Sequence, residues 1–188
     1  MSENQQPKKL GRNAAVAGKS RVFYAFWPDD AVRPALQTWV DGAQAAAGGN
    51  PTQSRNLHMT LCFIGQVADE QLPMLSALAA ELPWQPLELV LDRAGWWKHN
   101  RVAWLGCSSL PAALAQSARA LRQQLLAHEI DFDDKPFVPH VTLLREVRPS
   151  QAWLDALKPL PPVRWTLQRP VLVLAARDAQ GACYHPLP

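Results

Sequence analysis

Cysteine is scarce in this chain, with three residues among 188. Cys62, Cys107 and Cys183 are odd in number and lie far apart in apolar, strand-like surroundings, which does not suit a disulfide framework. A chain of this length with 48% hydrophobic residues can bury a sizeable core without disulfide bonds. We therefore expect three reduced thiols within one compact domain.

Long apolar runs and metal-ligand spacings are also missing. No stretch of eighteen apolar residues occurs, and no basic-then-apolar leader precedes a small-residue cleavage site. The sequence contains no Cys-x-x-Cys pair and no two histidines at the spacing of a local zinc site. These absences predict a cytoplasmic protein with no membrane partner, no metal and no other cofactor.

Acidic and basic residues are close to balanced, with a formal net charge of +3. Residues 1–21 contain one acidic and five basic side chains and so carry +4, which leaves −1 for residues 22–188. Any polyanion contact on the main body must therefore come from a few placed arginines rather than from a broadly basic surface. Residues 1–20 lack apolar periodicity and are predicted to form a disordered basic tail, with a single domain over residues 21–188.

Strand-like and helix-like segments alternate from residue 21 onward. Three segments have the apolar character of buried strands, residues 22–27, 56–64 and 138–146. Three helices are expected from capping and proline signals, over residues 31–47, 69–82 and 111–130. A hairpin is expected between residues 87–94 and 101–107, and closing strands over 164–176 and 182–185. This order predicts an α+β fold rather than a doubly wound parallel sheet.

The most informative feature is a repeated tetrad. The pattern His-x-Thr-Leu occurs at residues 58–61 and again at residues 140–143, in two strand-like segments. Because side chains alternate along a strand, the His and Thr of each copy face one side and the other two residues face the opposite side. Two such strands related by a pseudo-twofold axis would place two imidazoles and two hydroxyls around one cleft.

This set of groups suits phosphodiester chemistry without a metal. Attack of water on a cyclic phosphate needs one proton removed and another donated, and imidazoles with an ordinary pKa of about 6.5 can do both near neutrality. The threonine hydroxyls can donate to the non-bridging phosphate oxygens. The repeat therefore predicts His58 and His140 as catalytic residues, with Thr60 and Thr142 as ligands of the substrate phosphate.

Two other interpretations of these histidines are weaker. A single histidine on an apolar strand is most often a core residue with its hydrogen bonds satisfied, but the repeated threonine argues against this for both copies. A zinc site using both histidines would need a third ligand, and the sequence indicates none. The other three histidines lack a threonine partner and are expected to have no catalytic role: His99, His128 and His185.

At these motifs the sequence resembles the 2H phosphoesterase superfamily, and within it the bacterial and archaeal RNA 2′,3′-cyclic phosphodiesterases, first described as 2′-5′ RNA ligases. The resemblance covers nearly all of residues 21–188 and rests on segments 23–28, 56–65 and 136–145. Members of that family fold as two pseudo-symmetric lobes around a central cleft, each an antiparallel sheet backed by helices. The resemblance implies this architecture here, with the motif histidines facing each other and the chain a monomer.

The resemblance also implies a reaction, the hydrolysis of a 2′,3′-cyclic phosphate at an RNA end to a 2′-phosphomonoester. The ends of tRNA halves are one candidate substrate, and reversible 2′-5′ ligation would be a secondary activity. In the family scheme His58 protonates the departing 3′ oxygen, His140 deprotonates water, and Arg145 binds the phosphate. Strict alternation places Arg145 on the face opposite His140, so a bulge or the strand end must redirect it.

Other functions stay open at the level of sequence. The same histidines could open a small cyclic phosphate, such as ADP-ribose 1″,2″-cyclic phosphate or a cyclic mononucleotide, and only substrate profiling separates these from RNA. A module that merely binds RNA ends is disfavoured, because imidazole is a poorer dedicated phosphate binder than Arg or Lys. Three aromatic residues could stack on a base, but strand aromatics more often belong to the core: Phe63, Trp96 and Trp97. The small-residue stretch 175–181 departs from the family pattern and concerns substrate preference rather than chemistry.

Overall fold

The computed structural model of this chain describes residues 18–148, 150–179 and 181–187. The tail predicted for residues 1–20 lies outside these ranges except for residues 18–20. Strand β1 (Lys19–Phe26) already includes Lys19 and Ser20, so the first strand starts two residues earlier than the expected boundary. Among the described residues, no helix combines the length and the apolar character needed to cross a lipid bilayer.

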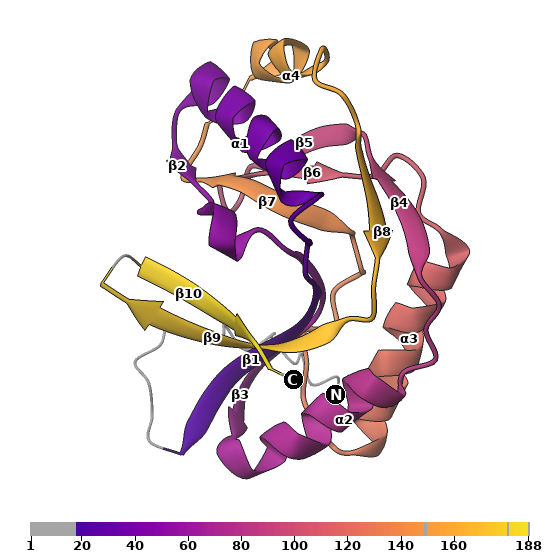
Figure 1. Cartoon of the computed structure of the whole chain (residues 1–188). Coiled ribbons are helices and arrows are strands. Elements are labelled where there is room, and N and C mark those ends of the chain that lie inside the picture. Colours follow the sequence, from indigo (N-terminus) through magenta and orange to yellow (C-terminus); the bar gives the residue numbers. More distant parts are fainter. Residues whose placement is uncertain (1–17, 149, 180, 188) are drawn as a thin grey trace, which may run out of the picture.

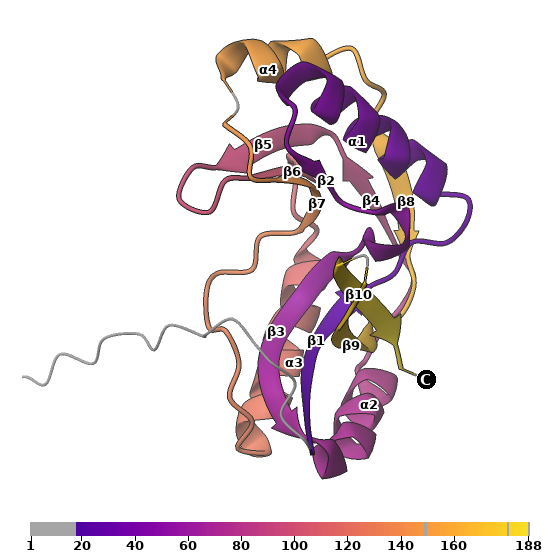
Figure 2. The ribbon, with the colours of Figure 1, turned by 90° about the vertical axis from the view of Figure 1, so that its left-hand side faces the viewer.

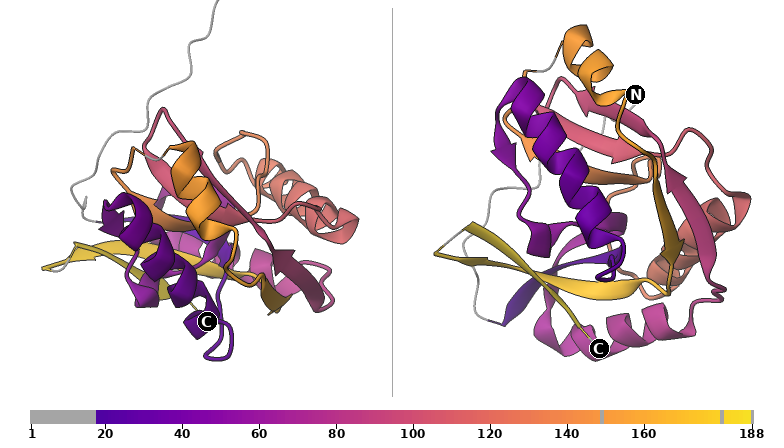
Figure 3. Two further views of the ribbon diagram at one scale, coloured as in Figure 1. Left: turned by 90° about the horizontal axis from the view of Figure 1, so that it is seen from above. Right: turned by 45° about the horizontal axis from the view of Figure 1, so that its top comes forward.

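Antiparallel pairing connects seven strands in the order β10-β9-β1-β3-β7-β6-β5 (Figure 1). Besides β1, these are β3 (Met59–Ala68), β5 (Arg93–Trp97), β6 (Val102–Gly106), β7 (His140–Arg145), β9 (Val171–Asp178) and β10 (Gly181–Pro186). The short strand β2 (Asn50–Pro51) pairs with β7. A separate pair, β4 (Leu87–Leu91) with β8 (Val163–Leu167), runs along the side of the molecule (Figure 3).

The long sheet consists of two halves that meet at a single residue pair, Met59 of β3 opposite Val141 of β7. Helices α2 (Leu72–Glu81) and α3 (Ala112–Ala127) back the half that contains β1, β3, β9 and β10. Helices α1 (Arg33–Ala47) and α4 (Gln151–Leu157) back the half that contains β5, β6 and β7 (Figure 1). The expected α+β fold with two antiparallel, helix-backed lobes is therefore confirmed.

Two helices cross from one lobe to the other. Helix α1 follows β1 in the chain but packs against β7, and α3 follows β6 but packs against β3. Each strand that carries a tetrad thus comes after a crossover helix, β3 after α1 and β7 after α3. The order strand, crossover helix, motif strand therefore occurs twice, once for each lobe.

Helix α1 shows how the sequence places these elements. Its start is prepared by Asp29, whose carboxylate accepts hydrogen bonds from the backbone N–H groups of Ala31 and Val32 at 3.1 and 2.9 Å. Apolar residues then recur at three- and four-residue intervals and are buried on one face: Leu36, Trp39, Val40 and Ala43. A 3-10 turn η1 (Ser54–Asn56) leads into β3, and a second, η2 (Asp69–Gln71), leads into α2.

Two strand predictions were wrong. The hairpin expected from residues 87–94 is formed instead by β5 and β6, in which the Trp104 ring lies directly over Gly95, its cross-strand partner, where no side chain would fit. Strand β4 pairs with β8. The long strand expected over residues 164–176 is divided between β8 and β9, since Pro170 lacks the N–H group that a strand ladder needs. Helix α4 was not anticipated.

Candidate active site

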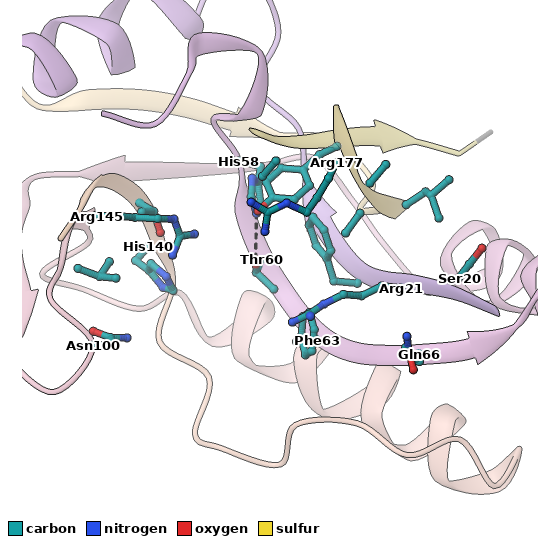
Figure 4. Close-up of a pocket in the computed structure, with 18 of the residues that line it drawn as sticks. Ser20, Arg21, His58, Thr60, Phe63, Gln66, Asn100, His140, Arg145 and Arg177 are labelled. Atoms are coloured by element: carbon teal, nitrogen blue, oxygen red, sulfur yellow. Dashed lines mark hydrogen bonds between the residues drawn. The ribbon is translucent and has the colours of Figure 1, made fainter. Parts of the chain in front are cut away.

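Both tetrads lie where the two lobes meet. His58 directly precedes β3, and His140 is the first residue of β7. The residues that follow them, Met59 and Val141, pair with each other and are fully buried, which leaves the flanking histidines and threonines on the open side of the sheet. All four line one cleft of about 660 Å³ (Figure 4). The repeat thus brings these residues together, while their chemical roles stay a prediction.

A β-bulge in β7 decides where Arg145 points. Thr142 and Leu144 pair with consecutive residues of β6, so Leu143 between them is an extra residue. An extra residue shifts the alternation of side chains by one position. Arg145 therefore returns to the face that carries His140 and lines the cleft (Figure 4). The redirection that strict alternation required is a bulge at the leucine of the tetrad.

Strand β3 contains the same device. Thr60 and Cys62 pair with consecutive residues of β1, so Leu61 is the extra residue. Phe63 consequently faces the cleft, at the position equivalent to that of Arg145. The two lobes therefore share a backbone design, in which the residue three positions after the threonine reaches the site.

The backbone fixes which imidazole nitrogen is available for chemistry. The Nδ1 atom of His58 lies 2.6 Å from the carbonyl oxygen of Asn56, and that of His140 lies 2.8 Å from the carbonyl oxygen of Val138. A carbonyl can only accept, so Nδ1 carries the hydrogen in both rings. Each Nε2 is left for substrate, and that of His58 lies 3.2 Å from Thr60 Oγ1 (Figure 4).

Aromatic rings enclose His58 on several sides. The ring centroids of Phe23, Tyr184 and Trp27 lie 5.0, 5.1 and 5.7 Å from that of His58, with Trp27 stacked at 11°. Burial among these rings lowers the pKa of His58 to about 4, and the positive charge of Arg145 acts in the same direction. The hydrogen bond to the Asn56 carbonyl opposes this shift without cancelling it. His58 is therefore neutral at pH 7 in the free protein.

His140 has a different environment. One ring, that of Trp97, stands edge-on to it at 4.5 Å and 81°. Burial, with a smaller contribution from Arg145, lowers the pKa of His140 below its ordinary value, and the bond to Val138 opposes the shift. Both histidines are therefore neutral at pH 7 before substrate binds.

A smaller chamber of about 350 Å³ adjoins the cleft on the side of β2 and η1. The two share His58, Thr142, Arg145 and Arg177, so they meet at His58. The wall of the smaller chamber is rich in amide and hydroxyl groups, from Asn50, Thr52, Gln53 and Asn56. These four side chains can form hydrogen bonds, and the charge in the chamber comes from Arg145 and Arg177.

The tip of the β9–β10 hairpin is held against η1 (Figure 2). The buried side chain of Asn56 donates from Nδ2 to the carbonyl oxygen of Ala182 at 2.7 Å. Arg55 and Asp178 form an ion pair of 2.8 Å beside it. Arg177 lies opposite Ala182 in this hairpin, so the two contacts place Arg177 at the cleft.

Sequence reasoning missed Arg177. Its side chain lines both chambers and extends toward the region of His58 and Thr60 in Figure 4. Arg177 belongs to the stretch 175–181, which the family resemblance connected with substrate preference, but no local motif marks it. Its position depends on contacts of the hairpin with residues more than 120 positions earlier in the chain.

The aromatic residues divide between core and cleft. Trp96 packs against Trp153 at 6.3 Å next to the core, as expected, whereas Phe63 and Trp97 line the cleft, contrary to expectation. Alternation could have identified Phe23, since it lies on the site face of β1. Among the described residues His99, His128 and His185 line neither chamber. The three cysteines are free thiols, as predicted.

Metal ligands do not gather in the part of the chain that is described. No three His, Cys, Asp or Glu side chains there are close enough to hold one ion. The groups that converge at the cleft are instead imidazoles, hydroxyls and guanidiniums. This chemistry matches acid–base catalysis on a bound anion.

Comparison with known proteins identifies the family. Residues 28–179 match the family described as the 2′-5′ RNA ligase superfamily. The chain belongs to this superfamily. The resemblance to 2H phosphoesterases, first seen in the two tetrads, is thereby confirmed.

Individual members of the 2′-5′ RNA ligase superfamily are similar over most of their length. The RNA 2′,3′-cyclic phosphodiesterase of Escherichia coli is 36% identical over 126 residues, which are 67% of this chain and 72% of that protein. A protein of the same name from Thermus thermophilus is 31% identical over 177 residues, 87% of this chain and 86% of that one. The crystal structure of E. coli LigT in apo form has a TM-score of 0.77 at 30% identity and covers 92% and 96% of the two chains.

Proposed function

We propose that this chain hydrolyses 2′,3′-cyclic phosphates at RNA ends to 2′-phosphomonoesters, by acid–base catalysis with two histidines and without a metal. The observation that carries the proposal is the pair of imidazoles in one cleft, each oriented by a backbone carbonyl so that Nε2 is available. The relatives at 36% and 31% identity are RNA 2′,3′-cyclic phosphodiesterases by name, which supports the reaction and RNA as the partner.

The proposed reaction is a single in-line displacement at phosphorus. His140 Nε2 takes a proton from water as the water oxygen attacks, the bond from phosphorus to the 3′ oxygen breaks, and His58 Nε2 donates a proton to that oxygen. The product carries a 2′-phosphate and a free 3′-hydroxyl. Each histidine ends in the opposite protonation state, and exchange with solvent restores both.

Substrate binding favours the protonated form of His58 that the division into acid and base requires. His58 must be protonated before the chemical step, although its pKa is about 4 in the free protein. A phosphate anion in the cleft stabilises an imidazolium beside it and raises this pKa. Protonation of His58 is therefore coupled to substrate binding.

The remaining motif residues act on the phosphate oxygens. Thr60 and Thr142 donate from their hydroxyls to the two non-bridging oxygens, one from each lobe. The Arg145 guanidinium stabilises the negative charge that grows in the transition state. Since these donors are fixed by strand backbone, they need little reorganisation during the reaction.

Several finer properties belong to the same proposal. Residues 21–188 act as one two-lobed domain, because both lobes contribute to a single site. We further propose a monomer that acts in the cytoplasm, with tRNA halves among its substrates. The single domain and the monomer are supported by a site that is complete within one chain, and the tRNA halves by the family resemblance. The cytoplasmic location is an expectation from the sequence alone.

The experiment that tests the proposal uses the purified chain in EDTA. A short RNA with a 2′,3′-cyclic phosphate end is incubated with wild-type protein and with a His58→Ala, His140→Ala double variant. A gain of one water by mass, with a product phosphate that phosphatase removes, is expected for the wild type alone. A cyclic end that survives, or turnover that EDTA abolishes, contradicts the proposal.

A further inference from the structure

The cleft carries more positive charge than one cyclic phosphate requires. Four cations line it, Lys19, Arg21, Arg145 and Arg177, and no Asp or Glu among the described residues does so. Residues 22–188 have a net charge of −1, and Lys19 and Arg21 bring residues 19–188 to only +1, so the positive charge is concentrated at the cleft. A cyclic phosphate is a monoanion, so the cleft suits a ligand with several phosphates.

Two of these cations extend away from the histidines along β1. Lys19, Arg21 and Phe23 are alternate residues of the strand and line the same cleft. Arg21 lies opposite Gln66 on one side and Ala175 on the other, and the small side chain of Ala175 leaves the surface open beside it. Each two-residue step along β1 is about 6.7 Å, comparable to the distance between neighbouring phosphates of an extended RNA strand.

An aromatic ring lies beside this row of cations. The Arg21 guanidinium is 4.9 Å from the centre of the Phe63 ring, and Phe63 lies between Arg21 and Thr60 on the site face (Figure 4). Cationic grooves with interleaved aromatic rings are typical of surfaces that bind single-stranded nucleic acid, where cations contact the backbone and rings stack on bases. A cyclic mononucleotide has no second phosphate to place against these cations.

We propose that Lys19, Arg21 and Arg177 bind the phosphodiesters on the 5′ side of the terminal cyclic phosphate, so that the chain selects an RNA strand over a cyclic mononucleotide. This inference rests on the proposed function and specifies its substrate class. Arg177 contacts the phosphate next to the reacting one, and the strand continues along β1 past Arg21 to Lys19. On binding, the Arg21 guanidinium turns from the Phe63 ring to a phosphate, and the ring then stacks on a base.

The test compares two substrates with the same terminal base, a 2′,3′-cyclic mononucleotide and a tetranucleotide that ends in it. The variants are Arg21→Gln and Lys19→Gln, because Arg177 borders His58 and its loss would also affect the reacting phosphate. For the tetranucleotide, kcat/KM is expected to fall about tenfold in Arg21→Gln and about threefold in Lys19→Gln. The mononucleotide value changes by less than about twofold.

Salt dependence provides a second measurement of the same contacts. Each phosphate contact removed should make the plot of log kcat/KM against log salt less steep by about 0.7 for the tetranucleotide. Matched controls are Arg164→Gln and Lys158→Gln, whose side chains pair with Glu88 and Asp155 at the surface and line neither chamber. Both controls are expected to behave as wild type with either substrate.

Equal losses for the two substrates, or none for the tetranucleotide, would overturn the inference. So would a wild-type protein that processes the mononucleotide as well as the tetranucleotide. A wild type that opens neither substrate contradicts the proposed function instead. Binding of a fluorescent tetranucleotide with a 2′-phosphate end then tests the inference separately, since Arg21→Gln should weaken it about tenfold.

Discussion

The β3 and β7 strands have the same backbone plan but different surroundings. In each, the motif histidine donates from Nδ1 to a carbonyl two residues earlier, and the motif leucine forms a bulge. His58 nevertheless lies among three aromatic rings, whereas His140 lies against one. The position after the bulge is Phe63 in one strand and Arg145 in the other.

This comparison explains how a repeated motif can support an asymmetric reaction. Hydrolysis of a phosphodiester needs an acid and a base, which are different states of the same side chain. The shared backbone places two equivalent imidazoles, and burial lowers the pKa of both, with three aromatic rings around His58 and one beside His140. Phe63 and Arg145 add a second asymmetry, because the Phe63 ring suits stacking on a nucleobase whereas the Arg145 guanidinium suits a phosphate.

The largest expected effect comes from removing one histidine at a time. His58→Ala and His140→Ala should each lower kcat by about 10²–10⁴-fold with a smaller change in KM, since each loses one proton transfer in the transition state. The pH dependence separates the two roles. Loss of the acid, His58, should remove the alkaline fall in kcat, and loss of the base, His140, the acidic fall.

Steady-state rates between pH 4 and 9 would measure this difference. The opposite pattern would mean that His58 is the base and His140 the acid. This alternative needs a test, because burial lowers the pKa of His58 and keeps it neutral in the free protein. Two variants with the same pH profile would contradict any division of roles. His99→Ala, which changes an exposed turn residue, provides the control and should retain wild-type rates.

An intermediate effect is expected where the two strands differ most. Arg145→Gln should lower kcat/KM for a cyclic-phosphate RNA by about 10–100-fold, because a charged hydrogen bond to the phosphate is lost. Phe63→Leu should lower it by about fivefold, through lost stacking alone. Arg145→Lys keeps the charge and should recover part of the rate. Equal losses in Arg145→Gln and Phe63→Leu would show that the asymmetry has no role in binding.

The smallest expected effect is a change in the pKa of His58 when its aromatic surroundings are altered. Trp27→Leu opens the aromatic enclosure, so the pKa of His58 should rise from about 4 toward its ordinary value of 6.5, while that of His140 is unaffected. NMR titration of the imidazole Cε1 protons measures both. If the two pKa values stay where they are, the ring stacked on His58 is not a cause of its shift.

The same pKa predicts how stability depends on pH. The folded pKa of His58 is lower than the unfolded one, so the unfolded state takes up the proton first as pH falls. His58 therefore favours the folded state above pH 6.5, and this contribution is lost as pH falls from about 6.5 to about 4. In Trp27→Leu the loss should be smaller, and urea unfolding at pH 7 and pH 4 would measure it.

Some tertiary features could be predicted because they depend on neighbouring residues. The alternation of side chains places His58 beside Thr60 on one face, and the repeat implies a second such face. The predicted hairpin between residues 87–94 and 101–107 was wrong because strand pairing depends on residues that are distant in the chain. Whether residues 87–91 pair with β6 or with β8 depends on a partner more than 70 positions later, and local pattern cannot choose between them.

The sequence by itself determined the α+β class, the four motif residues and the charge that separates the first 21 residues from the rest. Only the tertiary structure decided that bulges bring Arg145 and Phe63 into the cleft, that Tyr184 packs on His58, and that a pinned hairpin delivers Arg177. The physical reason is range. Backbone alternation and capping act over a few residues, whereas the pKa of a histidine and the reach of an arginine depend on groups that packing brings together from distant parts of the chain.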